Sequence, residues 1–365
     1  MTIFPTTEAE LSEAITSATT PLVISGGGTR RVRTADGAHL STARLSGIVD
    51  YEPGALTMVA KAGTPLSDIQ AALAAEHQQL AFEPSLMGSV LGQDGQSTIG
   101  GVFATNASGP RRIQAGAARD FLLGVRFVDG AGNVVKNGGR VMKNVTGYDL
   151  VKLLAGSWGT LGVMSEVSFK VLPLAETMAT IAVHVSDAAT ATAAMTASLN
   201  TPFDVTGAAY DPASGRAVVR VEGFEKSVAY RAAALRDVLA QFGAVEILDN
   251  AASAPIWTGL QNLDALVGTT GDLWRVSVKP TDGAEVIARV GPTAYVMDWS
   301  GGLIWMRTAA GQDVRTALTG IDGHATCHIG RAPQFHPNAA GVEMLMSAIR
   351  SKFDPHAKLN QGLMG

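Results

Sequence analysis

The segment from Ser97 to Arg112, STIGGVFATNASGPRR, limits most strongly what this chain can fold into. Small residues fill most of its positions, so its backbone can approach a neighbouring molecule closely. Ordering so many small residues loses much conformational entropy, and a purely structural role does not explain that loss. We therefore expect a loop that lays its backbone along an extended ligand, with polar contacts from Asn106, Ser108, Arg111 and Arg112.

A second glycine-rich loop, SGGGTRR, directly follows the apolar run PLVIS at residues 21–25, which predicts a buried strand. Consecutive glycines can turn backbone N–H groups toward a bound phosphate, and Thr29 and Arg30 add a hydroxyl and a positive charge. The dinucleotide-binding fingerprint does not fit, because its third glycine would fall at Arg31 and no helix is predicted after it. Taken alone, the loop is explained equally well as a plain connection between two strands.

A third cluster runs from Met142 to Val167 and reads MKNVTGYDLVKLLAGSWGTLGVMSEV. It predicts a polar turn, a short helix, a second turn at GTLGV, and then a strand. The second turn could present backbone N–H and C=O groups to a purine edge. The alternative is an ordinary helix–turn–strand connection in which glycines end the helix.

The length of 365 residues predicts more than one domain, because single cores stop growing at about 250–300 residues. After Pro173 glycine becomes rarer, and the order strand, helix (188–199), two strands, helix (225–242), strand resembles a split β-α-β unit. The predicted fold class is α+β. We divide the chain into a first domain at 1–173, an α+β cap with an antiparallel sheet at 174–320, and a segment at 321–365 that returns to the first domain.

The balance of 28 basic and 32 acidic residues gives a formal charge of -4 and no basic excess that would indicate nucleic-acid binding. The single cysteine, Cys327, cannot form an internal disulfide or an iron–sulfur ligand set; we expect it to act as a small buried hydrophobe. No signal peptide and no run of about 20 apolar residues is found. We expect a cytoplasmic protein, and peripheral association with the inner membrane through a complex stays open.

Together, the three clusters resemble the FAD-binding domain of the p-cresol methylhydroxylase (PCMH) and vanillyl-alcohol oxidase superfamily, over about residues 5–173. The resemblance implies a two-part PCMH-type domain in which the first loop holds the pyrophosphate, the small-residue segment lines the flavin, and the third cluster holds the adenine end. The cofactor-binding residues that it implies are Ser25, Gly26, Gly27, Gly28, Thr29, Arg30, Thr98, Gly100, Gly101, Ala104, Thr105, Asn106, Ser108, Gly109, Arg111, Gly147, Tyr148, Asp149, Gly162, Val163 and Asn360.

The C-terminal half carries four further motifs, LWRVSVKP, MDWSGGLIW, GHATCHIG and FDPHAKLNQG. These resemble the E-subunit family of glycolate oxidase, a flavoprotein that oxidises glycolate to glyoxylate. The resemblance implies two partners, a larger FAD-binding subunit and an iron–sulfur subunit. It also implies hydride transfer to FAD and passage of the electrons to those partners.

Two departures from the superfamily matter. The loop SGGGTRR lacks the histidine through which some members tether FAD covalently, so we expect noncovalent FAD. GHATCHIGR lacks the GDGN core of the metal-dependent 2-hydroxy-acid dehydrogenases, which argues against independent catalysis. His324 and His328 share one face of the predicted strand, but no carboxylate partner is evident, so we predict no metal; they can instead line the domain interface.

Oxidation of a 2-hydroxy acid needs a cation for the carboxylate and a base for the hydroxyl proton. Arg275 is our candidate for the first role, because guanidinium binds carboxylates bidentately, although it could equally be a surface strand residue. His324 is our candidate base. Two alternatives stay open: a stand-alone FAD-dependent dehydrogenase for another 2-hydroxy acid or alcohol, and a scaffold subunit that binds FAD without catalysis of its own.

Overall fold

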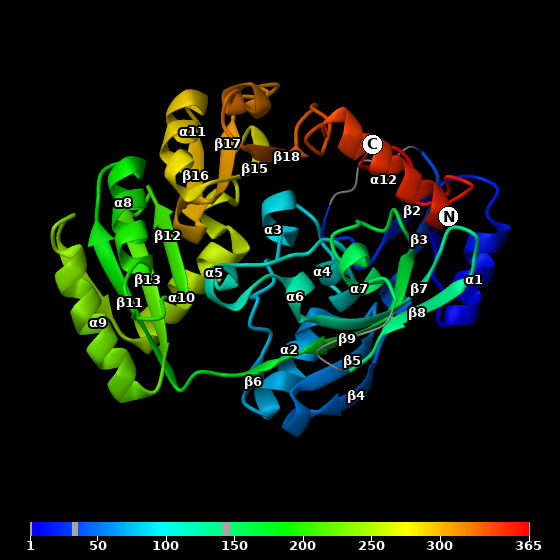
Figure 1. Cartoon of the computed structure of the whole chain (residues 1–365), viewed down its shortest axis with the longest axis horizontal. Helices are drawn as coiled ribbons and strands as arrows, with labels where there is room; N and C mark the ends of the chain where they lie inside the picture. Colours follow the sequence, from blue (N-terminus) through cyan, green and yellow to red (C-terminus); the bar gives the residue numbers. More distant parts are fainter. Residues whose placement is uncertain (1, 31–35, 141–146, 365) are drawn as a thin grey trace.

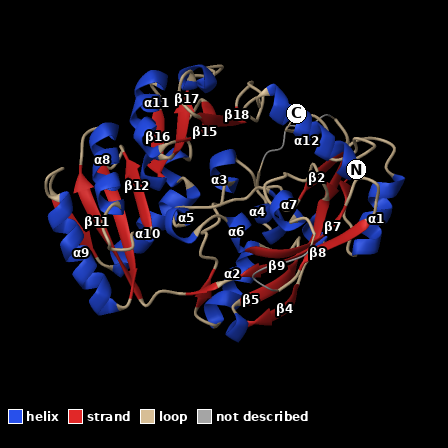
Figure 2. Ribbon diagram, viewed as in Figure 1, coloured by secondary structure: helices blue, strands red, loops and turns tan. Residues whose placement is uncertain are grey.

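The computed structural model describes residues 2–30, 36–140 and 147–364 and arranges them in two α+β parts that lie side by side (Figures 1 and 2). We call residues up to 173, together with the C-terminal helix and tail, the N-terminal part. Residues 174–330 form the cap. Arg31 and the polar turn predicted at 142–146 lie outside the described residues.

Besides an antiparallel pairing of β6 (Gln78–Gln79) with β10 (Leu172–Pro173), the N-terminal part contains two larger sheets. The smaller one is parallel, with strand order β1-β3-β2. Leu11 and Ile15 of helix α1 (Glu8–Ser17) pack in one small core with residues of this sheet. Thr7 caps the helix by accepting from the Glu10 N–H. The strand bounds are Thr2–Ile3 for β1, Leu22–Ser25 for β2 and Ala38–Ser41 for β3.

The larger sheet of this part is antiparallel, with strand order β4-β5-β9-β7-β8. Strands β7 and β8 pair as a hairpin, and the strand predicted at the end of the third cluster is confirmed as β9. Short helices fill the space between this sheet and the smaller one. The elements are β4 (Ile48–Glu52), β5 (Thr57–Lys61), α2 (Leu66–Ala75), β6 (Gln78–Gln79), α3 (Gly88–Leu91), α4 (Ile99–Ala104), α5 (Arg112–Ala115), α6 (Ala118–Phe121), β7 (Leu122–Val128), β8 (Val134–Gly138), α7 (Leu150–Leu154), β9 (Val163–Lys170) and β10 (Leu172–Pro173).

The cap is one eight-stranded antiparallel sheet with the order β14-β11-β13-β12-β16-β17-β15-β18. Its two four-stranded halves meet at a single pair, Tyr210 and Met297. Helices α8, α9 and α11 contribute to the core on one face. The elements are β11 (Thr177–His184), α8 (Ala188–Leu199), β12 (Gly207–Asp211), β13 (Arg216–Gly223), α9 (Glu225–Leu239), β14 (Val245–Leu248), α10 (Asn250–Asn262), β15 (Asp272–Val278), α11 (Gly283–Val290), β16 (Ala294–Asp298), β17 (Leu303–Thr308) and β18 (Gly323–Ile329).

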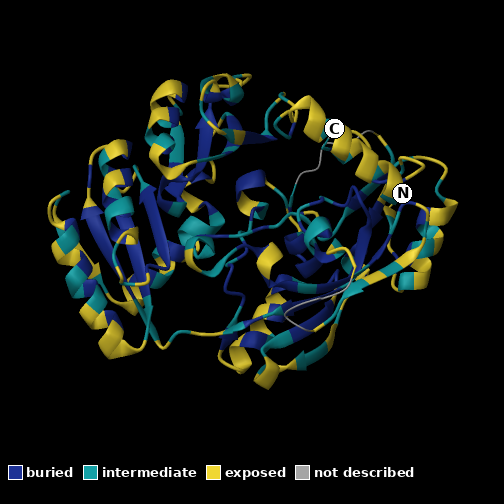
Figure 3. Cartoon of the chain, in the orientation of Figure 1, coloured by how far each residue is buried: buried dark blue, intermediate teal, exposed yellow. Residues whose placement is uncertain are grey.

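The last segment divides between the two parts. Strand β18 pairs with β15 in the cap sheet, whereas α12 (Ala340–Phe353) and the tail lie against the N-terminal part. The tail extends the smaller sheet, since the Leu22 N–H donates to the Lys358 carbonyl at 2.7 Å. Helix α12 is largely exposed (Figure 3). No helix among the described residues is long and apolar enough to cross a membrane.

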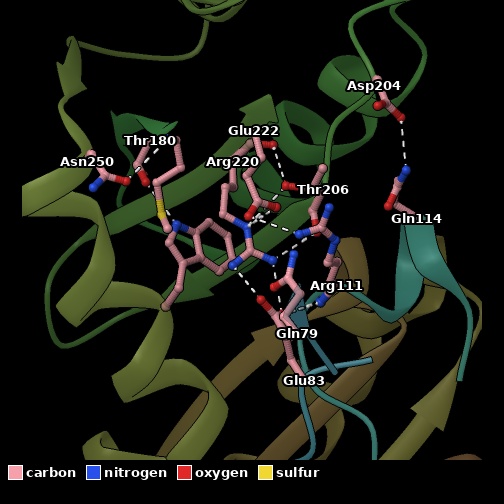
Figure 4. Close-up of polar contacts among 12 residues, drawn as sticks. Gln79, Glu83, Arg111, Gln114, Thr180, Asp204, Thr206, Arg220, Glu222 and Asn250 are labelled. Carbon is pink, nitrogen blue, oxygen red and sulfur yellow. Dashed lines mark hydrogen bonds and ion pairs between the residues drawn. The ribbon is translucent and has the colours of Figure 1, made fainter. Parts of the chain in front are cut away.

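Buried ion pairs join the two parts (Figure 4). Arg220, on cap strand β13, lies 2.8 Å from Glu83 of the N-terminal part and 3.2 Å from Glu222. Arg111 completes the set, because its guanidinium lies 3.0 Å from Glu222 and its backbone N–H donates to Glu83 at 2.8 Å. Although burial alone would lower the pKa of Arg220, the two carboxylates raise it above its ordinary value.

An apolar contact also joins the parts. Val90 and Leu91 of α3 pack with cap residues that include Leu273 and Trp305. The buried Arg307 donates to the Val90 carbonyl at 3.2 Å across the same boundary. This face of the cap sheet therefore looks toward the N-terminal part.

Replacing Arg220 with methionine should lower the free energy of unfolding by about 3 kcal/mol or more, because Glu83 loses its counter-ion and Glu222 keeps only that of Arg111. Arg216→Met on the same strand is the matched control, since the ion pair of Arg216 with Glu246 is partly exposed and should contribute at most about 1 kcal/mol. Urea unfolding of both variants measures the difference. Equal losses would contradict the role given to Arg220.

Candidate functional site

A cleft of about 810 Å³ opens between the two sheets of the N-terminal part. Loops and helices from all three glycine clusters meet there. The predicted residues that line it are Ser25, Gly26, Gly27, Gly28, Thr29, Arg30, Thr98, Gly100, Gly101, Ala104, Thr105, Gly162 and Val163.

Close packing explains the glycines of the first loop. A Cβ at Gly26 would lie 2.3 Å from the Thr98 hydroxyl oxygen, and one at Gly27 would lie 1.6 Å from the Gln96 carbonyl oxygen. Gly28 has a φ of +76°, in the left-handed region that glycine adopts freely. The loop therefore presents bare backbone to the cleft.

The small-residue segment differs from the extended loop that we expect from sequence. Residues Ile99–Ala104 form helix α4, and Thr98 caps it by accepting from the Gly101 N–H at 3.3 Å. Gly100 allows this helix to lie against β5, since a Cβ there would be 2.6 Å from that of Ala62. Small residues thus serve close helix packing as well as access to the cleft.

Eight predicted cofactor residues are not among those that line this cleft, and four of the eight belong to the small-residue segment. The Asn106 side chain accepts the Arg119 N–H at 2.9 Å, and the Ser108 hydroxyl accepts the Ala118 N–H at 2.9 Å. Gly109 and Arg111 lie at the boundary with the cap. The structure places all four as supports of the segment.

Residues Gly147, Tyr148 and Asp149 lie exposed before α7, and Asp149 caps that helix by accepting from the Lys152 N–H at 3.1 Å. Asn360 is buried beneath the cleft. Its side chain accepts the Ile24 N–H and donates to the Trp158 carbonyl, each at 2.7 Å. It therefore fixes the strand before the first glycine loop against the Trp158 turn.

The cleft also includes residues that the sequence did not single out. Trp158 and Gly159 stand within the third cluster, so that motif could have indicated them. Ser97, Val102 and Met164 also lie within the glycine clusters, whereas Thr42, Ala62 and Ser85 come from segments without a recognisable signal. These further lining residues are Ile24, Thr42, Ala62, Ser85, Ser97, Val102, Trp158, Gly159 and Met164.

A cationic cluster borders the cleft at the boundary with the cap. Arg30 lines the cleft, Arg112 comes from α5, and Arg275 comes from β15. Burial, and then the charges of Arg112 and Arg30, lower the pKa of Arg275 to about 10. Within the described part of the chain, none of the three guanidinium groups forms an ion pair with a carboxylate.

Aromatic rings surround this cluster. The Arg275 guanidinium carbon lies over Trp299 at 5.4 Å and over Trp305 at 6.0 Å, and that of Arg112 lies over Trp299 at 4.5 Å. His328 is buried with its ring centroid 5.1 Å from that of Trp305. Such rings stabilise cations without neutralising them, so the charges stay available to an anion.

His324 lies on β18, beside the strand that carries Arg275. Desolvation, followed by the charges of Arg275, His336 and Arg112, lowers its pKa. The imidazole is therefore neutral, and able to accept a proton, at neutral pH. Among the described residues no group of three or more potential metal ligands occurs.

Asp298 ends β16 beneath the cluster. Its carboxylate accepts the Trp299 N–H at 2.7 Å. Burial first, and then the charge of Glu83, raise the pKa of Asp298 from 3.8 to about 7, although Arg220 and the Trp299 N–H act in the opposite direction. Trp299 and Ser300, the next two residues, both have left-handed φ angles, of 51° and 60°. The backbone of the turn that contains Trp299 is therefore strained, and the surrounding structure maintains this conformation.

Comparisons with known proteins indicate an FAD-binding family. A family model described as an FAD binding domain matches residues 1–138. The chain is 33% identical over 359 residues to the glycolate oxidase subunit GlcE of Escherichia coli, which covers 97% of this chain and 95% of that protein. It is 31% identical over 186 residues to the glycolate oxidase subunit GlcD of Bacillus subtilis, which covers 49% of this chain and 38% of that protein.

Among solved structures, alkyldihydroxyacetonephosphate synthase is similar with a TM-score of 0.70 and 14% sequence identity, over 100% of this chain and 77% of that one. This likeness concerns the fold. With the family match, it confirms the expected α+β architecture with a PCMH-type FAD-binding domain.

The cleft fits FAD. Its glycine loop carries no side chains that would fill the space where a pyrophosphate could lie, and Arg30 and Thr29 supply a charge and a hydroxyl at its side. The residues Trp158–Met164 and α4 give the long, mostly apolar walls that ring systems require. The chain binds FAD, and the three glycine clusters are the sequence signal for it.

Replacing Gly101 with valine should reduce the FAD content of the purified protein at least tenfold. Within 4 Å a Cβ at Gly101 meets only the Thr98 hydroxyl oxygen, at 3.2 Å, so a larger side chain extends into the cleft. Gly341→Val is the matched control, because Gly341 also lies in the first turn of a helix and its Cβ would meet nothing. Flavin absorbance per protein gives the measurement, and equal FAD content in both variants would contradict the assignment.

Asp298 should make the stability of the protein fall as pH rises. Its pKa is about 7 in the folded state against 3.8 ordinarily, so the stabilisation is complete below about pH 4 and is lost as pH rises through 7. At about 1.4 kcal/mol per pKa unit, the loss is of the order of 4 kcal/mol. Asp298→Asn keeps an acceptor for the Trp299 N–H and should flatten this part of the curve. Urea unfolding from pH 5 to 8 checks it, and parallel curves would refute it.

Proposed function

Because the chain belongs to the family of the glycolate oxidase subunit GlcE, we propose that it is the FAD-binding subunit of a complex that oxidises glycolate, a small 2-hydroxy acid, to glyoxylate. FAD-dependent oxidation is the activity common to its relatives. The observation that favours an acid substrate is the cationic cluster of Arg30, Arg112 and Arg275 beside the FAD cleft. Partly buried guanidinium groups without carboxylate partners favour an anionic ligand.

In this proposal the chain's residues bind the acid and take one proton. Arg275 binds the carboxylate through two parallel N–H donors, and Trp305 and Trp299 hold its guanidinium in place. His324 takes the hydroxyl proton, since its lowered pKa leaves it neutral at neutral pH. Bound FAD supplies the acceptor for the hydride that leaves the substrate carbon, so that a two-electron oxidation is complete.

FAD is proposed to be noncovalent. Of the described residues that line the cleft, none is a histidine, cysteine or tyrosine, the side chains that could form a tether. The same cleft keeps the bound cofactor close to the domain boundary, where the cationic cluster lies.

Electrons are proposed to leave through a larger FAD-binding subunit and an iron–sulfur subunit. The similarity to a subunit of a glycolate oxidase supports this division of work. Among the residues described here, the only thiol is the buried Cys327, so an iron–sulfur cluster would have to be supplied by another chain. Association with the inner membrane, if it occurs, is proposed to run through those partners.

In the complex assembled with both partners, His324→Gln should lower kcat for glycolate by about 100-fold, because a positioned base is lost. Arg275→Gln should chiefly raise KM, by about tenfold or more, since charge-assisted bonds to the carboxylate are lost. The acid limb of the kcat/KM profile, which falls as His324 becomes protonated, should disappear in His324→Gln. Steady-state assays with a dye acceptor give these values.

Arg236→Gln serves as the control, because Arg236 is half exposed on α9 and pairs only with its neighbour Asp237. Normal glycolate turnover in both the His324 and Arg275 variants would overturn the catalytic role and favour a scaffold that binds FAD. Turnover of another hydroxy acid by the isolated chain, without its partners, would instead favour a stand-alone dehydrogenase.

A further inference from the structure

Trp299 contacts residues of both the N-terminal part and the cap. Its indole N–H donates to the Gly109 carbonyl of the N-terminal part at 3.0 Å, and its backbone N–H donates to the cap residue Asp298. Two guanidinium groups lie over its ring, that of Arg112 from the N-terminal part and that of Arg275 from the cap. A single side chain therefore connects arginines from both sides of the boundary.

The position of this ring is fixed from several directions. Trp299 has a left-handed φ of 51°, a conformation that a bulky residue adopts only when its surroundings impose it. Gly109 is fixed in turn, because its N–H donates to the Phe82 carbonyl at 2.9 Å and a Cβ on it would lie 2.2 Å from the Glu83 carbonyl oxygen. The ring is thus held by a glycine that packs against the loop carrying Glu83 of the ion-pair network.

Arg112 has the features of a ligand-binding residue. Desolvation lowers its pKa, and the charge of Asp120 offsets this only in part. No hydrogen bond from its guanidinium is found within the described residues. Its neighbour in sequence, Arg111, is by contrast engaged with Glu222. The two adjacent arginines therefore have separate roles, one in joining the parts and one beside Arg275.

We infer that Arg112 is a second carboxylate-binding residue of the site and that Trp299 is the positioning residue that holds Arg112 and Arg275 together across the boundary. This inference rests on the proposed function for its ligand class, a small carboxylate such as a 2-hydroxy acid. Because the cations come from both parts, the anion binds only where the N-terminal part and the cap meet. Neither part alone would bind it.

Oxalate is a suitable probe, because it carries carboxylates but has no hydrogen to give up and so only binds. Titration of the FAD-loaded protein with oxalate, followed by the flavin absorbance and by tryptophan fluorescence, gives the Kd. Arg112→Gln should raise the Kd about tenfold or more. Arg119→Gln is the matched control, because it removes the same charge from an exposed arginine seven residues further along the chain. The Kd of this variant for oxalate should stay within about twofold of the wild-type value.

Two variants test Trp299. Trp299→Ala should raise the Kd for oxalate as much as Arg112→Gln does, and in the assembled complex it should raise KM for glycolate more than it lowers kcat. Trp299→Phe keeps a ring but loses the bond to Gly109, so a several-fold rise in Kd is expected, together with loss of the oxalate-dependent change in fluorescence. FAD content confirms that each variant is folded; should the alanine variant not fold, the phenylalanine variant decides.

Oxalate binding by Arg112→Gln that equals the wild-type value, or no binding by the wild-type protein, would overturn the inference. Wild-type affinity in Trp299→Phe with an unchanged fluorescence response would overturn the role of Trp299. If oxalate binding depends on Arg112 but the assembled complex oxidises no 2-hydroxy acid, the anion site stands and the proposed function fails.

Discussion

The ion pairs of the buried Arg220 with Glu83 and Glu222 are the interaction on which the placement of the site depends. They fix the loop before α3 against cap strand β13. The same loop packs against Gly109, whose carbonyl holds Trp299. Since an uncompensated buried charge is strongly destabilising, the two parts have one preferred arrangement. That arrangement brings residues from both of them to the mouth of the FAD cleft.

The positive charges of the arginines are stabilised in one way around Arg220 and in another way around Arg275. Around Arg220 every cation has a carboxylate partner, whereas Arg112 and Arg275 have aromatic rings beside them and Arg30 donates to Ser85 and Met87. A ring stabilises a guanidinium group without using up its N–H donors. The first arrangement holds the structure together, and the second leaves positive charge for a ligand. The strained turn at Trp299 and the buried Asp298 lie beside Arg275. Backbone strain and shifted pKa values commonly occur at functional sites.

Much of the FAD-binding part could be predicted from sequence, because its signals are local. The strand before SGGGTRR, the hairpin formed by β7 and β8 and the capped helix α1 all follow from short-range patterns. The order of the eight cap strands could not be predicted, because it depends on pairings between distant residues. Nothing local distinguishes Arg111 from Arg112, yet one pairs with Glu222 and the other stacks on Trp299. Small residues predicted contact with a ligand, but not that residues 99–104 would be helical.

The visible absorbance spectrum of the purified protein, before and after acid precipitation, tests most directly whether the cleft holds noncovalent FAD. The glycine loop, the lining of the cleft and its lack of a tethering side chain among the described residues predict a flavin spectrum that moves to the supernatant on precipitation. Flavin that stays with the precipitate would contradict the noncovalent assignment. A colourless protein that also fails to take up added FAD would contradict the account as a whole.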